Sequence, residues 1–212
     1  MLDALRTILD TGIVAIIRSD SPRGLIQTVR ALAAGGVRAI EVTMTTPGAL
    51  EAISAAAAEA GEEFVIGAGS VLDGASGRAA VLAGAEFLVA PTTDADTIRL
   101  ARRHGKAVVP GALSPTEVIS AREAGADVVK IFPASLVGAG YLEALAGALP
   151  QVRTMPVGGV NLDNAADFLR AGACALGVGS SLVNRRAIAA GDWAAITATA
   201  RRFIETVAAA RS

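Results

Sequence analysis

A lysine embedded in an apolar strand is the residue of this sequence best suited to covalent chemistry. The sequence contains only two lysines, Lys106 and Lys130, among its 19 basic residues. Lys130 lies in the apolar run 127–133, where alternation places its side chain on the same face as Val128 and Phe132. Burial lowers the pKa of a lysine and frees its amine to attack a carbonyl group. Lys130 is therefore our candidate nucleophile.

A carboxylate holds a comparable position in a second apolar run. In residues 39–44, alternation puts Ala39, Glu41 and Thr43 on one face and bulky apolar residues on the other. Because the apolar face would meet the surrounding helices, we expect Glu41 and Thr43 to point inward. Burial raises the pKa of an unpaired carboxyl, which suits a general acid or base. The alternative is a structural salt bridge between Glu41 and Lys130.

Two glycine clusters follow the last two predicted strands. Gly158 and Gly159 follow one strand, and Gly179 and Ser180 lie in the run 177–181 after the next. Backbone N–H groups that glycine leaves open bind phosphate without a basic patch. The alternative is a pair of tight turns with no ligand.

Composition and charge argue against several other kinds of site. The chain has 212 residues, of which 52% are apolar, and its 19 basic and 20 acidic residues create no broad basic field for nucleic acid or a membrane surface. The single cysteine, Cys174, and the single histidine, His104, have no zinc-ligand spacing. The longest apolar run near the N-terminus, residues 13–17, is too short to span a membrane. We expect a cytoplasmic protein with no metal site.

The elements that must position these residues alternate along the chain. Pairs such as Ala34-Gly35 close alanine-rich stretches, and a short β-branched run follows each pair. Ser114 and Glu117 have the spacing of a capping box at a helix start. Residues 2–9 predict a short helix before the first strand. Eight strands are predicted, at residues 13–17, 38–44, 64–66, 87–89, 107–109, 127–132, 152–157 and 174–178.

Eight strands that each precede a helix predict an α/β fold. We expect a (β/α)8 TIM barrel with a short N-terminal helix, formed by a single domain over residues 1–212. Catalytic residues of such a barrel lie at the C-terminal ends of its strands. The alternative is an open, doubly wound sheet. Against it, neither glycine run, 67–72 or 177–182, contains the third glycine of a dinucleotide-binding fingerprint.

Five motifs resemble those of a known enzyme family, and they lie at residues 40–43, 66–71, 109–111, 129–134 and 156–160. Over nearly its whole length the sequence resembles the 2-keto-3-deoxy-6-phosphogluconate (KDPG) aldolases. That family includes the 4-hydroxy-2-oxoglutarate (KHG) and 6-phosphogalactonate aldolases. The resemblance implies a class I aldolase that uses no metal or organic cofactor and assembles as a homotrimer.

The resemblance also implies roles for residues in these motifs. Lys130 is the Schiff-base lysine and Glu41 is the general acid/base. Three further residues line the pocket of the substrate: Ser70, Pro91 and Phe132. Four residues hold its phosphate: Gly158, Gly159, Gly179 and Ser180.

One position departs from the family pattern. Many members place an arginine four residues after the catalytic glutamate to receive the substrate carboxylate, and Thr45 stands there in this chain. Arg18, at the end of the first predicted strand, is our candidate for this task because a guanidinium matches a carboxylate bidentately. Alternatively, Arg18 is a rim residue that pairs with Asp20. We count Thr43 and Thr45 with Arg18 among the residues that bind the substrate.

The predicted reaction is cleavage of a small 2-keto acid. Its substrate would be a 2-keto-3-deoxy-6-phospho sugar acid or 4-hydroxy-2-oxoglutarate, and its products would be pyruvate and an aldehyde such as glyceraldehyde 3-phosphate. Two other functions fit the same barrel: a phosphosugar epimerase or isomerase, and a non-catalytic barrel that binds a phosphorylated metabolite. Of the three, only the aldolase requires an imine on a lysine.

Overall fold

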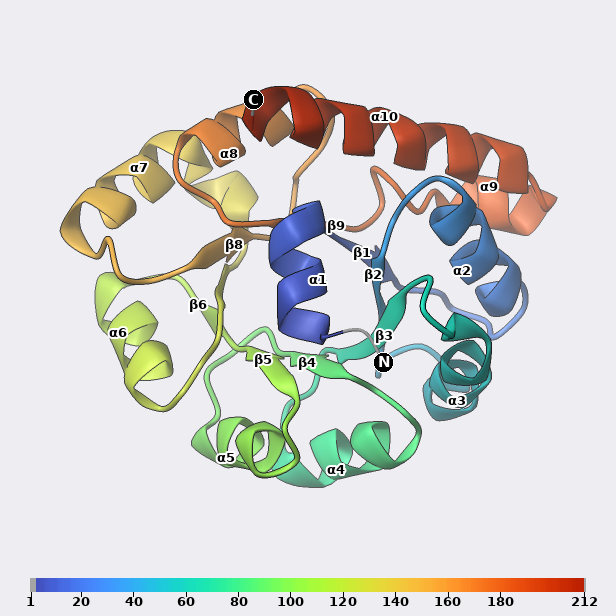
Figure 1. Ribbon diagram of the computed structural model, residues 1–212, viewed down its shortest axis with the longest axis horizontal. Helices are drawn as coiled ribbons and strands as arrows, with labels where there is room; N and C mark the ends of the chain where they lie inside the picture. Colours follow the sequence, from blue (N-terminus) through green and yellow to red (C-terminus); the bar gives the residue numbers. More distant parts are fainter. Residues whose placement is uncertain (1–2, 212) are drawn as a thin grey trace.

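Strands and helices alternate along most of the computed structural model, which describes residues 3–211 (Figure 1). The strands are β1 (Ile13–Ile17), β2 (Ala39–Thr43), β3 (Val65–Gly69), β4 (Phe87–Val89), β5 (Ala107–Val109), β6 (Gly111–Ala112), β7 (Val129–Ile131), β8 (Thr154–Pro156) and β9 (Leu176–Val178). The helices are α1 (Ala4–Thr11), α2 (Leu25–Ala34), α3 (Ala49–Ala60), α4 (Gly74–Leu82), α5 (Ala95–Arg103), α6 (Pro115–Glu123), the 3-10 helix η1 (Ala134–Leu136), α7 (Gly138–Ala148), α8 (Ala165–Arg170), α9 (Arg185–Ala190) and α10 (Trp193–Arg211). Every predicted strand overlaps an observed one, and β6 was not predicted.

The prediction of a closed eight-stranded barrel is wrong. Six parallel strands form one curled sheet, a half-barrel, in the order β5-β4-β3-β2-β1-β9, and a separate three-stranded sheet has the order β6-β7-β8. Between the end of β8 and β9 there is one isolated bridge, which joins Val157 to Gly177. The α/β class and the parallel pairing agree with the prediction, whereas the continuous ladder of a closed barrel does not form.

Two prolines account for the breaks in the ladder. Pro110 separates β5 from β6, so residues 107–109 pair with β4 and residues 111–112 pair with β7. Pro156 is the last residue of β8, at the place where the ladder between β8 and β9 is interrupted. Because proline has no backbone N–H, neither residue can donate the bond that would carry a ladder through its position.

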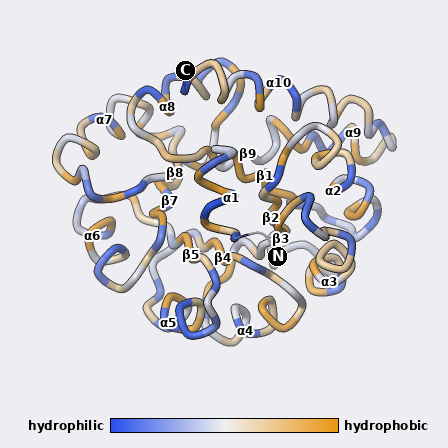
Figure 2. Tube along the Cα trace, viewed as in Figure 1, coloured by the Kyte–Doolittle hydropathy of each residue, from blue (hydrophilic) through white to orange (hydrophobic). Residues whose placement is uncertain are grey.

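Apolar residues form two layers around the strands. The inner layer includes Val14, Phe87 and Met155, which point away from the helices, and the outer layer fills the space between strands and helices. In Figure 2 the hydrophobic residues gather along the central strands, and hydrophilic residues are frequent on the outer helices. No helix within residues 3–211 is long and apolar enough to cross a membrane.

The predicted N-terminal helix covers one end of the inner layer. It begins after Asp3, whose side chain accepts a hydrogen bond from the Arg6 N–H, and it ends at Thr11, before Gly12. The predicted first residue, Leu2, lies outside the described part of the chain. Ala4 and Ile8 of α1 belong to the inner apolar layer. Figure 1 shows α1 across the centre of the ring of helices. Because α1 directly precedes β1, it lies at the N-terminal ends of the parallel strands, and their C-terminal ends are on the opposite side.

The contact between α2 and α10 leaves no room for a side chain at Gly35. A Cβ atom there would overlap the Ala200 Cβ and would lie 2.8 Å from the Thr197 carbonyl oxygen. We expect Gly35→Ala to destabilise the protein by about 1–3 kcal/mol through overpacking. Gly147→Ala on α7 is the matched control, because a Cβ there would meet no atom within 4 Å.

The control variant should be as stable as the parent protein or more stable by up to about 1 kcal/mol, since alanine favours helix. Urea unfolding of both variants measures the difference in the free energy of unfolding. Equal free energies for the two variants would contradict the close approach of α2 and α10.

Candidate active site

Lys130 and Glu41 enter the interior from opposite sheets. Lys130 is the middle residue of β7 and is 5% exposed, and Glu41 is the middle residue of β2 and is 1% exposed. The ion pairs formed within residues 3–211 do not include this pair, so no nitrogen–oxygen distance of 4.0 Å or less joins the two side chains. The structure therefore does not contain the direct salt bridge considered as the alternative.

The surroundings of Lys130 favour its neutral amine. Burial lowers the pKa of Lys130 from its ordinary value of 10.5, and the positive charge of Arg18 acts in the same direction, whereas the nearby Glu41 carboxylate opposes the shift. The Lys130 Nζ lies 4.8 Å from the centre of the Phe132 ring. Phe132 is half-buried and forms a wall beside the amine.

The surroundings of Glu41 favour its protonated form. Burial raises the pKa of Glu41 from 4.5 to about 7, although the positive charges of Lys130 and Arg18 lower it. The Oε2 atom of Glu41 is buried and has no hydrogen-bond partner within the described residues. A carboxyl that titrates near neutrality can both release and take up a proton at physiological pH.

Gly69 creates the space that the Glu41 carboxyl occupies. It lies at the end of β3, beside Thr43 in the ladder, and a Cβ at this position would overlap the carboxyl of Glu41. The motif 66–71 thus contributes two features to the site: Ser70, and the missing side chain of Gly69, which leaves room for the Glu41 carboxyl.

Arg18 reaches across the sheet from β1 to the end of β3. It follows β1, and its Nη2 donates a hydrogen bond of 3.4 Å to the Ser70 Oγ. Ser70 is the one non-glycine residue of the described chain with a positive φ, 54°, a conformation that costs energy and is frequent at functional sites. Asp20, the alternative partner of Arg18, instead accepts a hydrogen bond of 2.8 Å from Arg185.

Three threonine hydroxyls meet where β2 ends. The Thr43 Oγ1 lies 3.1 Å from the Thr45 Oγ1 and 3.1 Å from the Thr46 Oγ1. Thr43 and Thr46 are buried, whereas Thr45 is exposed. Thr46 was not among the predicted site residues.

The phosphate residues named from the sequence lie around one cavity. Its volume is about 320 Å³. Six of the predicted residues line it: Arg18, Phe132, Gly158, Gly159, Gly179 and Ser180. The other predicted residues, Lys130, Glu41, Thr43, Thr45, Ser70 and Pro91, are not part of its lining. Pro91 follows β4 and is half-buried beside Gly111, where a Cβ would overlap the Pro91 backbone.

The backbone at this cavity offers hydrogen-bond donors. Gly158 and Gly159 have φ values of 90° and 81°, which glycine adopts readily and other residues rarely do. The N–H groups of Gly159, Gly179 and Ser180 donate no hydrogen bond to residues 3–211. Unpaired N–H groups beside a cavity are suited to an anion.

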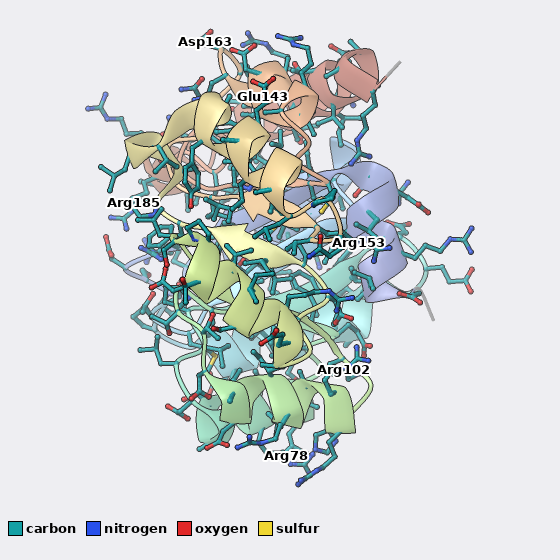
Figure 3. All side chains as sticks on the ribbon, turned by 90° about the vertical axis from the view of Figure 1, so that its left-hand side faces the viewer. Arg78, Arg102, Glu143, Arg153, Asp163 and Arg185 are labelled. Carbon is teal, nitrogen blue, oxygen red and sulfur yellow. The ribbon has the colours of Figure 1, made fainter. Side chains whose placement is uncertain are left out.

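Two polar lining residues were missed from the sequence. Ser181 and Arg185 border the same cavity. Ser181 belongs to the same run as Gly179, so the sequence could have indicated it. Arg185 is the first residue of α9, and no sequence pattern indicates that it borders the cavity. Figure 3 shows Arg185 on the side of the molecule opposite to Arg102 and Arg153. No cluster of three or more His, Cys, Asp or Glu side chains in the described chain could hold a metal ion.

Glu41 should make the stability of the protein depend on pH. Its pKa is higher in the folded protein, about 7, than the ordinary value of 4.5, so the folded state binds this proton more tightly. The resulting stability is fully present below pH 4.5 and is lost as the pH rises through about 7, and 2.5 pKa units correspond to about 3 kcal/mol.

A Glu41→Gln variant lacks this titration. Relative to the parent protein it should therefore gain about 3 kcal/mol between pH 4 and pH 8. Urea unfolding at the two pH values measures this gain, and Glu205→Gln on the exposed face of α10 serves as the control. If Glu41→Gln and the control show the same pH dependence, the raised pKa is wrong.

Comparisons with known proteins place this geometry in a family. A family model described as KDPG and KHG aldolase matches residues 5–199. The 2-dehydro-3-deoxy-phosphogluconate aldolase of Treponema pallidum (strain Nichols) is 36% identical over 199 residues, which cover 92% of this chain and 93% of the relative. The 2-dehydro-3-deoxy-6-phosphogalactonate aldolase of Escherichia coli (strain K12) is 35% identical over 171 residues, covering 80% of this chain and 83% of the relative.

A solved structure agrees with the sequence relatives. KDPG aldolase from Legionella pneumophila, with pyruvate captured at low pH as a covalent carbinolamine intermediate, matches with a TM-score of 0.85 at 27% identity, over 94% of this chain and 97% of that one. The prediction of an aldolase of this kind is confirmed. The chain belongs to the KDPG and KHG aldolase family.

Proposed function

We propose that this aldolase cleaves a 2-keto-3-deoxy-6-phospho sugar acid, or 4-hydroxy-2-oxoglutarate, through an imine on Lys130. The observation that carries the proposal is a lysine 5% exposed on β7, with a lowered pKa and with Glu41 across the interior. Pyruvate forms a covalent carbinolamine in the Legionella pneumophila relative, which supports the same first step here.

The first half of the reaction builds an electron sink. The lone pair of the Lys130 amine attacks the C2 carbonyl carbon of the substrate and forms a carbinolamine. Loss of water then gives a protonated imine. Burial supports this step because it keeps a fraction of Lys130 neutral, and only the neutral amine has the lone pair that attacks.

The second half breaks the carbon–carbon bond. Glu41 takes the proton of the C4 hydroxyl, directly or through a water molecule, and an aldehyde forms at C4. The electron pair of the C3–C4 bond moves to C3 and C2, and the imine nitrogen is neutralised as an enamine. Glu41 returns a proton to C3, and water hydrolyses the imine to release pyruvate and free Lys130.

A phosphorylated substrate would extend toward the cavity beyond β8 and β9. The free N–H groups of Gly159, Gly179 and Ser180, with Gly158 beside them, are the proposed phosphate donors. Arg18 and Arg185 add positive charge at the same cavity. With a six-carbon substrate, the aldehyde released would be glyceraldehyde 3-phosphate.

The resemblance implies a homotrimer, and the short apolar runs of the sequence predict a cytoplasmic location. Both stay predictions. A sedimentation measurement tests the first of them.

Borohydride reduction in the presence of pyruvate should attach one reduced pyruvate to Lys130. Because the chain has only two lysines, Lys106→Arg leaves Lys130 as the sole lysine and preserves a cation beside Glu86, which pairs with Lys106 at 2.7 Å. Peptide mass mapping should find the adduct on Lys130 in both proteins. Lys130→Arg should abolish the adduct and lower aldol cleavage by about a thousandfold or more.

An adduct on Lys106, or none at all, would refute the imine mechanism. Phosphosugar isomerisation and simple binding require no imine, so the absence of an adduct would favour those alternatives.

The role of Glu41 predicts a separate defect. Exchange of the pyruvate methyl protons with solvent requires the enamine and an acid/base group, so Glu41→Gln should slow this exchange by about a hundredfold or more. The adduct on Lys130 should still form. Proton NMR of pyruvate in deuterated buffer follows the exchange, and an unchanged exchange rate would assign the proton transfer to another group.

A further inference from the structure

The short strand β6 is held from two opposite sides. On one side it pairs with β7, where the Lys130 N–H donates a hydrogen bond of 2.8 Å to the Pro110 carbonyl. The Phe132 N–H donates one of 3.1 Å to the Ala112 carbonyl. Gly111 lies between these two acceptors and bonds instead to the segment that follows β4. The two-residue strand therefore depends on that segment for its hydrogen bonds on the second side.

A threonine hydroxyl completes the contact on the second side. The Gly111 N–H donates a hydrogen bond of 3.2 Å to the Thr92 carbonyl, and the Thr93 Oγ1 donates one of 3.0 Å to the Gly111 carbonyl. The two segments approach closely, because a Cβ at Gly111 would overlap the Pro91 backbone. Gly111 is buried, so loss of the Thr93 hydroxyl would leave its carbonyl without this partner in a place where an unpaired acceptor is costly.

Thr93 is attached to a regular helix. It is half-buried and directly precedes Asp94, the residue that caps the start of α5. The Asp94 side chain accepts two hydrogen bonds of 2.7 Å from Thr97, one from its N–H and one from its hydroxyl. These bonds fix the first turn of α5, so the hydroxyl that supports β6 has a defined place.

The contact joins the two sheets at a place that affects Lys130. The segment 91–93 follows β4, which belongs to the six-stranded sheet that carries Glu41. Gly111 belongs to the three-stranded sheet, in which it is the ladder partner of Lys130. A shift of β6 away from the end of β4 would therefore move Lys130 relative to Glu41.

We infer that Thr93 is a positioning residue, whose hydroxyl fixes β6 against the end of β4 and so sets the place of Lys130 relative to Glu41. The inference rests on the proposed function, in which these two groups act on one substrate. Thr93 lies outside the lining of the cavity and acts through Gly111. Displacement of reacting groups by about 1 Å can slow a reaction by about a hundredfold, so a small shift of β6 has a measurable effect.

Exchange of the pyruvate methyl protons tests this geometry, because it requires the imine on Lys130 and proton transfer by Glu41 together. Thr93→Val and the smaller Thr93→Ala should each lower the maximal exchange rate by about tenfold and change the half-saturating pyruvate concentration by less than about twofold. Borohydride should still attach pyruvate to Lys130 in both variants. Thr93→Ser keeps the hydroxyl and should restore the exchange rate of the parent protein.

Thr197→Val is the matched control. The Thr197 Oγ1 on α10 donates a hydrogen bond of 2.9 Å to the Ala31 carbonyl on α2, so it also joins two separate elements, both of them outer helices (Figure 1). Its loss should lower the free energy of unfolding in urea as Thr93→Val does, because each variant removes one bond from a threonine hydroxyl to a backbone carbonyl. The exchange rate of Thr197→Val should equal that of the parent protein.

An unchanged exchange rate in Thr93→Val and Thr93→Ala, an equal loss in Thr197→Val, or a Thr93→Ser variant as slow as Thr93→Val would each overturn the inference. A parent protein that neither exchanges the methyl protons nor traps pyruvate on Lys130 would instead overturn the proposed function, so the two failures are distinguishable.

Discussion

The rest of the structure depends on one constraint: two groups of opposite charge, Lys130 and Glu41, are buried without forming a direct ion pair. A direct contact between Lys130 and Glu41 would stabilise both charges and leave the amine protonated. Separated in the buried interior, each group instead shifts toward its neutral form, the lysine to a lower pKa and the glutamate to about 7. Burial of the two groups therefore lowers the stability of the folded protein near neutral pH, and it keeps the nucleophile and the proton-transfer group in forms that can react.

The fold maintains this separation through its topology and through small residues. β2 and β7 belong to different sheets, so each side chain is positioned by its own ladder. Gly69 leaves room for the Glu41 carboxyl, and Phe132 borders the Lys130 amine. Helix α1 covers one end of the inner apolar layer, and the cavity that Gly158 and Gly179 border lies beyond the C-terminal ends of β8 and β9.

Local patterns were sufficient to predict eight of the strands and the burial of Glu41 and Lys130 within them. Period-two alternation placed Glu41 and Lys130 inside the strands, and helix-ending glycines marked where strands begin. The closed ladder was predicted wrongly, because the effect of Pro110 depends on which strands pair on either side of it. The number of predicted strands does not show where a proline, which has no backbone N–H, interrupts the hydrogen bonds between neighbouring strands.

Features formed by distant segments were also beyond the sequence. Arg185 lies far along the chain from Arg18, yet both border the same cavity. The Thr46 hydroxyl accepts a hydrogen bond from the N–H of Ser19, 27 residues earlier, through a contact between two loops. Such contacts follow from the fold and have no periodic signature.

The scarcity of lysine makes the central claim directly measurable. In protein labelled with ¹³C at lysine Cε, only Lys106 and Lys130 contribute signals, and Lys106→Arg assigns them. The chemical shift of Lys130 followed against pH should show titration below 10.5, because burial disfavours its charged form. Titration of Lys130 at or above 10.5 would contradict the account, since the amine would then be protonated like that of an exposed lysine.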